Sequence, residues 1–199
     1  MYESKDYGYL IERSRFSERL LRDHFALYEG YVANTNRIID ALDGLSHAGK
    51  QRSPEFAELK RRFGFEFDGM RLHELYFETL GGAVPLDASS RVAERLGKEF
   101  GSFARWRTDF AAVAMMRGVG WTILYEDPGR DRLFNHWVNE HETGHLVGCR
   151  ALLVLDVFEH AFLLDYGLKR ADYIEAFLAE IDWMEVEDRL GGAPCKSES

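Results

Sequence analysis

The chain has 199 residues, 46% of them hydrophobic and 14% aromatic, which is enough for a large folded core and excludes a largely disordered protein. The formal net charge of −9 disfavours nucleic acid and anionic membranes as partners, because an acidic surface gains nothing from counterion release on binding them. The sequence lacks a run of about 18 apolar residues and the basic, apolar leader of a signal peptide, so we expect a cytoplasmic protein.

The first strongly periodic segment follows Ser17. Apolar and aromatic residues recur there at steps of three and four, a spacing that predicts a helix with one face in a core and the Ser17 hydroxyl as its N-terminal cap. Segment 44–54 contains Gly, Ser and Pro at loop density and predicts the end of this helix. The predicted buried face consists of Leu20, Leu21, His24, Leu27, Tyr28, Tyr31, Asn34 and Ile38.

A second helical pattern covers residues 56–81, with an interruption expected at 64–68. Its apolar face again contains a histidine, His73. Two antiparallel helices would therefore present His24 and His73 to one another. The other members of this face are Met70, Phe77 and Leu80.

Gly81, Gly82 and Pro85 end this region and predict a boundary between two domains. We assign residues 1–82 to an N-terminal helical hairpin domain and residues 83–199 to a C-terminal α/β domain. Short runs rich in β-branched and aromatic residues predict a small three-stranded antiparallel sheet in the second domain, surrounded by helices, so the expected fold class is α+β. The expected strands cover residues 121–126, 132–138 and 150–157, and the expected helices cover residues 89–96, 103–116, 173–183 and 184–190.

The last expected strand carries titratable groups into the core. Four apolar residues, 152–155, lead directly into Asp156, and His160 follows. An unpaired buried carboxylate costs several kcal/mol, so this one requires a cation, a hydrogen-bond network or a metal. A single buried histidine is more often a satisfied core residue. Together with His24 and His73, however, the pair forms a nitrogen and oxygen ligand set that suits iron, manganese or zinc, and iron or manganese best.

The sequence around this pair resembles the iron/manganese superoxide dismutases over nearly the whole length of the chain. Their signature at the second ligand pair has the form DVWEHAYYLDY and stands here as DVFEHAFLLDY at residues 156–166. LHELYFETL at residues 72–80 resembles the family's NHxxYWxxL helix and assigns a ligand role to His73. Further matches are FGSFARW at 100–106, GVGW at 118–121, RADYIEAF at 170–177 and DWMEVEDRL at 182–190.

The resemblance implies the disproportionation of superoxide to dioxygen and hydrogen peroxide at one iron or manganese ion per chain, with a solvent molecule as fifth ligand. In the family the first ligand precedes a pocket tyrosine by eight residues, whereas here His24 precedes Tyr31 by seven. Two residues that are seven positions apart lie on nearly the same face of a straight helix, so we expect His24 to remain a ligand. The alternative is a displaced His24 and a site with three protein ligands. The four implied ligands are His24, His73, Asp156 and His160.

Other positions depart from the family pattern. Leu72 replaces a pocket asparagine, and Phe158 replaces a tryptophan. Leu163 replaces a tyrosine that meets a histidine of the neighbouring subunit in the family, and the matching position of the first helix is Tyr28. Because the resemblance implies a homodimer or tetramer, the paired change indicates a repacked interface or a dimer that is built differently.

The resemblance also implies roles for residues around the metal. In the family a glutamine bonds the solvent ligand, and the two positions that supply it are Gly69 and His141 here. His141 and Tyr31 would therefore orient solvent or transfer protons, although a solvated loop histidine is the alternative for His141. Trp121 and Phe158 would exclude water from the cavity. Glu159 would bond the ligand histidine of the other subunit, and the alternative for it is a solvated glutamate on a helix face. Tyr173 would lie in the outer shell of the metal. Arg170, together with Lys169, would attract the superoxide anion.

Two other functions stay open. A non-haem iron oxygenase also uses histidines and a carboxylate, although it usually keeps two histidines and one carboxylate on one face. A non-catalytic metal-binding homologue or scaffold dimer would result if the changes at Leu72, Leu163 and the shortened first helix had removed redox function. Gly69 is typical of manganese proteins, whereas histidine at position 141 occurs with iron and in enzymes that accept either metal, so we slightly favour iron.

Overall fold

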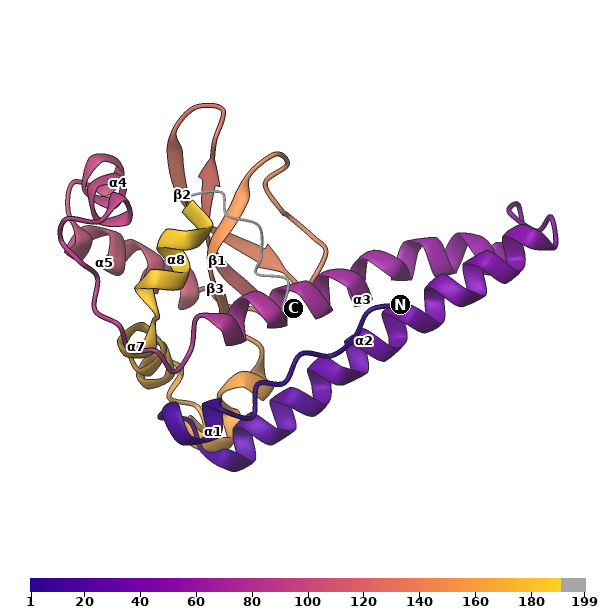
Figure 1. Cartoon of the computed structure of the whole chain (residues 1–199), viewed down its shortest axis with the longest axis horizontal. Coiled ribbons are helices and arrows are strands. Elements are labelled where there is room, and N and C mark those ends of the chain that lie inside the picture. Colours follow the sequence, from indigo (N-terminus) through magenta and orange to yellow (C-terminus); the bar gives the residue numbers. More distant parts are fainter. Residues whose placement is uncertain (191–199) are drawn as a thin grey trace.

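Two long antiparallel helices dominate the computed structural model, which describes residues 1–190 (Figure 1). Helix α2 (Glu18–His47) and helix α3 (Pro54–Glu78) lie side by side and project away from the rest of the molecule, and the short helix α1 (Leu10–Arg13) precedes them. This pair confirms the predicted helical hairpin. The end of the predicted C-terminal domain, residues 191–199, lies outside the described residues.

Both long helices begin with a serine cap. The Ser17 hydroxyl accepts a hydrogen bond from the Leu20 amide at 3.1 Å, as predicted, and the Ser53 hydroxyl accepts one from the Phe56 amide at the same distance. Helix α2 continues into the loop predicted at 44–54, so the connection between the helices is shorter than expected.

Helix α3 is continuous, and the interruption expected at residues 64–68 is wrong. Gly64 lies inside the helix, where a glycine costs only about 1 kcal/mol relative to alanine. Contacts of α3 with α2 and with the sheet offset this cost. A second glycine of the helix, Gly69, permits a close approach, because a Cβ atom there would lie 2.7 Å from the ring of Tyr31.

One residue of the predicted buried face of α2 points outward. Leu27 is 40% exposed, whereas Tyr28, the next residue, is 1% exposed. Successive helical residues are about 100° apart, and Leu27 lies at the edge of the stripe that α3 covers. The Tyr28 hydroxyl donates a hydrogen bond to Glu74 inside the hairpin at 3.1 Å. Tyr28 therefore bonds within its own hairpin, and the repacked or differently built subunit contact inferred from the sequence stays a prediction.

The second half of the chain contains the predicted three-stranded antiparallel sheet, in the order β2-β1-β3. Its strands are β1 (Gly120–Asp127), β2 (Arg132–Asn139) and β3 (Arg150–Asp156), each at or next to its predicted bounds. Trp121, near the start of β1, pairs with Asp156, the last residue of β3. Because paired residues of adjacent strands lie side by side, this register brings an indole and a carboxylate together at one end of the sheet.

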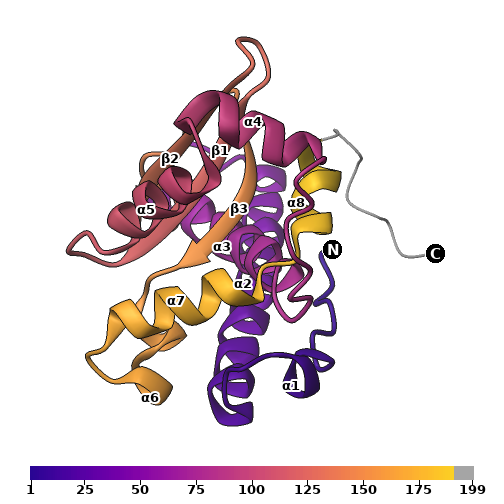
Figure 2. The ribbon, with the colours of Figure 1, turned by 90° about the vertical axis from the view of Figure 1, so that its left-hand side faces the viewer.

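Helices cover both faces of the sheet (Figure 2). On one face α4 (Arg91–Phe100) and α5 (Phe103–Ala114) contact the sheet, and on the other α3 packs against β3. The boundary between the last two helices lies earlier in the chain than predicted. The Asp182 carboxylate accepts a hydrogen bond from the Met184 amide at 2.9 Å and caps the start of the last helix. The elements after β3 are η1 (Glu159–Ala161), α6 (Leu163–Tyr166), α7 (Arg170–Glu180) and α8 (Trp183–Leu190).

A hydrophobic core joins the hairpin to the sheet. Leu21 of α2, Phe77 of α3 and Leu155 of β3 are all 0% exposed and belong to one cluster of buried residues. The architecture is therefore α+β, as predicted, while the domain boundary after residue 82 stays a prediction. In the part of the chain that the structure describes, we find no helix with the length and apolarity needed to cross a membrane.

Candidate metal centre

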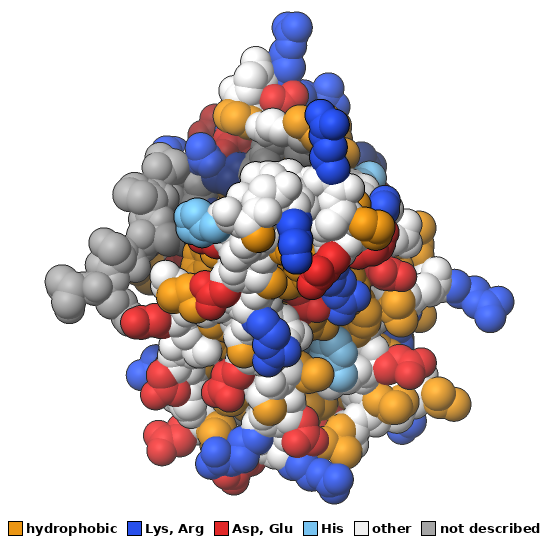
Figure 3. Space-filling model, turned by 90° about the vertical axis from the view of Figure 1, so that its right-hand side faces the viewer, with side chains coloured by type: hydrophobic (Ala, Val, Ile, Leu, Met, Phe, Trp, Pro, Cys, Tyr) orange, Lys and Arg blue, Asp and Glu red, His pale blue; other side chains and the backbone are white. Residues whose placement is uncertain are grey.

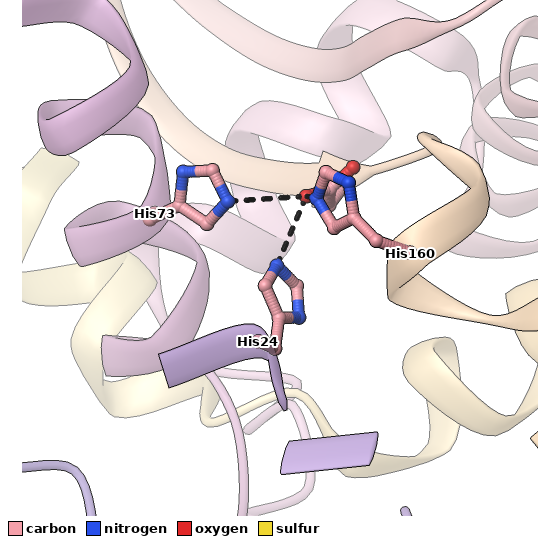
Figure 4. A group of neighbouring side chains, drawn as sticks. His24, His73 and His160 are labelled. Carbon is pink, nitrogen blue, oxygen red and sulfur yellow. Dashed lines mark hydrogen bonds and ion pairs between the residues drawn. The ribbon is translucent and has the colours of Figure 1, made fainter. Parts of the chain in front are cut away.

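Three histidines and one aspartate from distant parts of the chain meet at one point (Figure 4). Helices α2 and α3 contribute one histidine each, β3 contributes its terminal aspartate, and η1 contributes the third histidine. One ligand atom from each residue lies within 4.8 Å of the others. These residues are His24, His73, Asp156 and His160, and all but His160 are 0% exposed.

The three imidazoles point at the same oxygen atom. The Nε2 atoms of His24 and His160 each lie 3.1 Å from Oδ2 of Asp156, and Nε2 of His73 lies 3.6 Å from it. The other carboxylate oxygen, Oδ1, accepts a hydrogen bond from the Phe158 amide at 2.8 Å. The backbone after β3 therefore orients the carboxylate and leaves Oδ2 to the centre. His24 is not displaced by the seven-residue spacing to Tyr31, and α2 is a regular α-helix throughout.

The surroundings of His73 test whether a metal ion fits. Its Nδ1–H donates a hydrogen bond to the Gly69 carbonyl at 2.6 Å, so the neutral ring carries its lone pair on Nε2. That Nε2 atom is buried and finds no hydrogen-bond partner among the described residues. A lone pair that faces the Asp156 carboxylate repels it unless a cation lies between them. The donor set and its geometry therefore fit a metal ion of the iron or manganese kind.

The protonation states of the centre suit a cation. Burial lowers the pKa of His24, and it lowers the pKa of His73 further, so both rings are neutral at pH 7. Burial raises the pKa of Asp156, but His160 and His24 outweigh it and hold that pKa well below its usual range. Burial also lowers the pKa of His160, while the Asp156 carboxylate raises it above its ordinary value. The centre thus presents an ionised carboxylate to imidazole nitrogens, the arrangement that a divalent or trivalent ion neutralises.

A hydrogen-bonded chain adjoins the centre. The Trp121 indole N–H donates to Nδ1 of His141 at 3.1 Å, and Nε2 of His141 lies 2.7 Å from the Tyr31 hydroxyl. Because Nδ1 accepts, the proton of the neutral imidazole is on Nε2 and is donated to Tyr31. The Tyr31 ring stacks on His73 with 5.1 Å between ring centroids. His141 is 0% exposed, so the solvated loop histidine considered from the sequence is wrong.

Burial sets the proton affinity of this chain. It lowers the pKa of His141 to about 4, so the ring is neutral at physiological pH. It raises the pKa of Tyr31 to about 12, with the Asp156 charge acting in the same direction. Since His141 supplies the hydrogen bond to the Tyr31 oxygen, the phenolic proton is free for another acceptor. The pair can therefore hold a proton at Tyr31 Oη beside the centre.

The remaining predicted site residues surround this core. The Phe158 ring lies 4.8 Å from that of His141 and 5.3 Å from that of His160. The Tyr173 hydroxyl donates to the backbone carbonyl of Asp156 at 2.7 Å. Leu72 is buried, whereas Glu159, Leu163 and Lys169 are exposed.

Arg170 lies over the Trp137 ring, with 5.7 Å from its guanidinium carbon to the ring centroid. One of its N–H groups donates to the Gly118 carbonyl at 3.2 Å. Its Nε and Nη2 atoms are buried and have no hydrogen-bond partner among the described residues. The guanidinium therefore retains donors that an anion or solvent could use.

Sequence reasoning missed a group on α3 that borders the centre. The Phe65 ring lies 4.5 Å from that of His141, and the Arg62 guanidinium carbon lies 3.9 Å from the Phe65 centroid. Arg62 also forms an ion pair with the buried carboxylate of Glu66 at 2.6 Å. The available signal was the spacing, since Arg62, Phe65, Gly69 and His73 follow one another at steps of three and four along one side of a helix.

Comparison with known proteins gives a consistent result. The family model described as iron/manganese superoxide dismutases, C-terminal domain, matches residues 88–189. A protein named superoxide dismutase (Fe) from Cupriavidus metallidurans is 35% identical over 97% of this chain and 98% of the relative. A superoxide dismutase (Fe) from Methanothermobacter marburgensis is 34% identical over 92% of both chains. A superoxide dismutase (Mn) from Haloferax volcanii is 32% identical over 90% of this chain and 89% of the relative.

Proposed function

This chain belongs to the iron/manganese superoxide dismutase family, and we infer that it is a superoxide dismutase, which converts two superoxide anions and two protons to dioxygen and hydrogen peroxide. The observation that carries this inference is the convergence of three imidazole Nε2 atoms on one buried carboxylate oxygen. A bound iron or manganese ion supplies the one-electron exchange between divalent and trivalent states that this reaction needs. The residues that would hold it are His24, His73, Asp156 and His160.

Hydrogen bonds from the outer shell hold these ligands in place. The Gly69 carbonyl fixes the ring of His73, and the Phe158 amide fixes the carboxylate of Asp156. The Tyr173 hydroxyl holds the backbone at Asp156 and is itself 3.1 Å from the Tyr76 hydroxyl. Such contacts fix the orientation of the side chains that would hold the metal ion.

Tyr31 and His141 are the groups that we assign to proton supply. Hydrogen peroxide forms only when protons reach the reduced oxygen species, and the phenol of Tyr31 stays protonated because of its raised pKa of about 12. His141 holds the Tyr31 oxygen, and Trp121 fixes the His141 tautomer. Trp121 and Phe158 also line the centre with apolar surface and exclude water.

The metal and the assembly are finer parts of the proposal. Relatives named for iron and relatives named for manganese both match, and a set of three imidazole nitrogens and one carboxylate suits either ion. We place iron slightly ahead, because His141 occupies the position of the family glutamine. We further propose a cytoplasmic homodimer or tetramer in which Glu159 bonds the ligand histidine of the other subunit, and Arg170 with Lys169 attracts superoxide.

Metal reconstitution tests the function directly. Metal-free protein is loaded separately with iron and with manganese, and bound metal and superoxide decay are measured on the same samples. We expect about one ion per chain and activity with at least one of the two metals. Asp156→Asn removes the carboxylate ligand and is expected to lower metal affinity and activity at least as much as the loss of an outer-shell partner, which costs about 10- to 100-fold.

Asp172→Asn is the matched control, because it makes the same chemical change at an exposed position of α7 and leaves the ligands intact. Protein that holds one ion per chain but removes superoxide with neither metal contradicts the proposed function. That result would support the alternative of a non-catalytic, metal-binding homologue. Dependence of turnover on an organic co-substrate would favour the oxygenase instead.

A further inference from the structure

The metal centre meets solvent at a small set of half-buried rings. His73, Trp121 and His141 are 0% exposed, so an anion cannot approach the centre through them. The partly exposed rings beside the centre form a connected set, and each contacts another ring of the set or His141 at 4.5 to 6.1 Å between centroids. We call this set the rim; it consists of Tyr31, Phe65, Phe158 and His160.

Arg62 places a positive charge on the rim. Its guanidinium carbon lies 3.9 Å from the centroid of the Phe65 ring, a cation–π contact that holds the group over this ring. The side chain is 55% exposed. Phe65 in turn packs on His141, so the guanidinium is separated from the proton-supplying pair by one aromatic ring.

Glu66 orients this cation. Its carboxylate is 2.6 Å from Nη2 of Arg62, and it also accepts a hydrogen bond from the amide of Asn34 at 3.3 Å. The Glu66 side chain is only 4% exposed, whereas that of Arg62 is 55% exposed. The pair is therefore a dipole with its negative end inside the hairpin and its positive end in solvent at the rim.

The molecule as a whole does not attract an anion. The net charge is −9, and the face seen in Figure 3 carries Lys and Arg side chains interspersed with Asp and Glu. Attraction of superoxide must therefore come from local charges near the centre. Arg62 combines exposure with a fixed position over the rim.

We propose that Arg62, held over Phe65 and oriented by Glu66, is a guiding cation that draws superoxide to the rim of the metal centre. The proposal rests on the proposed function, because it names a further residue that serves the same substrate. Arg62 acts on the encounter with the anion and not on electron or proton transfer, so it is expected to affect kcat/KM more than kcat. The effect should weaken with ionic strength, since the Debye length falls from about 30 Å at 0.01 M to about 3 Å at 1 M.

Arg61 provides a matched control one residue away. Arg61 is 74% exposed and pairs with the exposed Glu58, so it lies in solvent on another side of α3. Arg62→Gln and Arg61→Gln each remove one positive charge and give the same net charge. At low ionic strength we expect Arg62→Gln to lower kcat/KM by about two- to fivefold and Arg61→Gln to leave it unchanged. Arg62→Lys should restore most of the loss.

Glu66→Gln tests the same idea with the opposite sign. Arg62→Gln leaves a buried carboxylate without its partner and could lower stability, whereas Glu66→Gln leaves an amide that still accepts from Arg62 and Asn34. We expect Glu66→Gln to raise kcat/KM by about twofold at low ionic strength, because the cation is no longer neutralised. Glu58→Gln, on the exposed pair, should not raise it.

Binding of azide, a small monoanion, provides a readout that does not depend on turnover. Spectroscopic titration of metal-loaded protein should give a dissociation constant about two- to fivefold higher in Arg62→Gln than in Arg61→Gln. Equal azide affinities, or an Arg62→Gln deficit that persists at 1 M salt, would overturn the proposal. If the wild-type protein binds metal but does not remove superoxide, the proposed function fails, and the azide titration still decides whether Arg62 attracts anions.

Discussion

Tyr31 lies between a ligand histidine and the hydrogen-bonded chain that fixes its hydroxyl. One face of its ring stacks on His73, and its oxygen bonds His141 at 2.7 Å. The third constraint comes from Gly69 of α3, where an added Cβ would lie 2.7 Å from the Tyr31 ring. The absence of a side chain at Gly69 is thus what allows Tyr31 to reach both neighbours.

Gly69→Ala is therefore expected to displace Tyr31 and lower activity. Ring atoms at 2.7 and 2.9 Å from the new methyl group must move, and the hydrogen bond to His141 lengthens with them. We expect kcat to fall by about tenfold, less than the roughly 100-fold or more that a positioned acid or base contributes, because Tyr31 is displaced and not removed. Stopped-flow measurement of superoxide decay, normalised to bound metal, gives the result.

Gly30→Ala is the control for this change. Gly30 also lies inside a long helix, but a Cβ atom there meets nothing within 4 Å. It should keep full activity and gain about 0.5 to 1 kcal/mol in unfolding free energy from the better helix former. A Gly69→Ala protein as active as Gly30→Ala would show that the position of Tyr31 does not limit the reaction.

At this scale the sequence predicts the centre better than its surroundings. Asp156 and His160 stand in a specific motif, and His73 follows from a helical stripe, so their convergence is predictable. The bond between Trp121 and His141 depends on the conformation of the segment after β2, which no periodicity encodes. The exposure of Leu27 could not be predicted either, because a stripe of apolar residues does not show how much of it the facing helix covers.

At the scale of elements, an ion pair between Glu99 and Arg132 links α4 to the sheet. The Glu99 carboxylate accepts hydrogen bonds from Nε of Arg132 at 2.8 and 2.9 Å and from Nη2 at 2.6 Å. It also accepts one from the Leu133 amide at 3.3 Å. A bidentate pair of this kind restricts orientation as well as distance. It therefore connects the end of α4 to the start of β2.

Glu99→Gln should weaken this connection in a pH-dependent way. Hydrogen bonds from Arg132 lower the pKa of Glu99 below its ordinary 4.5. A lowered carboxyl pKa stabilises the fold above the unfolded-state value, and this contribution is lost as the pH falls through the folded-state value. We expect the substitution to cost about 1 kcal/mol at pH 7 and progressively less below pH 4.5.

Urea denaturation of metal-free protein at pH 7 and in acid measures the difference between wild type and variant. Glu94→Gln, on the exposed side of the same helix, controls for the loss of one negative charge and should cost little at either pH. A Glu99→Gln deficit that is equal at both pH values would argue that the pair acts through packing and not through charge.

The strands of this fold are easier to predict than its helix boundaries. The turn residues after Asp127 and the β-branched runs on both sides of them determine where β1 ends and β2 begins in the hairpin. Helix α3, by contrast, passes through Gly64, because tertiary contacts outweigh a propensity difference of about 1 kcal/mol. Local composition indicates where a helix weakens, but not whether its neighbours hold it together.

At the scale of the whole molecule, exposed leucines follow directly on the metal centre. Leu163 and Leu164 are 45% and 44% exposed and lie three and four residues after His160. Their helix, α6, is attached to the start of α2 by bonds from Ser17 to the Asp165 carboxylate at 2.6 and 2.7 Å. Position 163 is the one where the family pattern has a tyrosine that meets the neighbouring subunit. An apolar contact between two copies would replace that polar contact.

Leu163→Glu is therefore expected to dissociate the proposed dimer. Each partner would bring a carboxylate into an apolar contact, and two such charges without partners cost several kcal/mol. Wild-type protein should sediment at about twice the chain mass of 23.0 kDa at micromolar concentration, and the variant at 23.0 kDa. Val147→Glu makes the same type of change at a fully exposed position and should leave the assembly intact. A monomeric wild type, or equal dissociation of both variants, would exclude this face as the interface. If only Leu163→Glu loses the dimer, the leucines form an apolar subunit contact in place of the polar contact of the family.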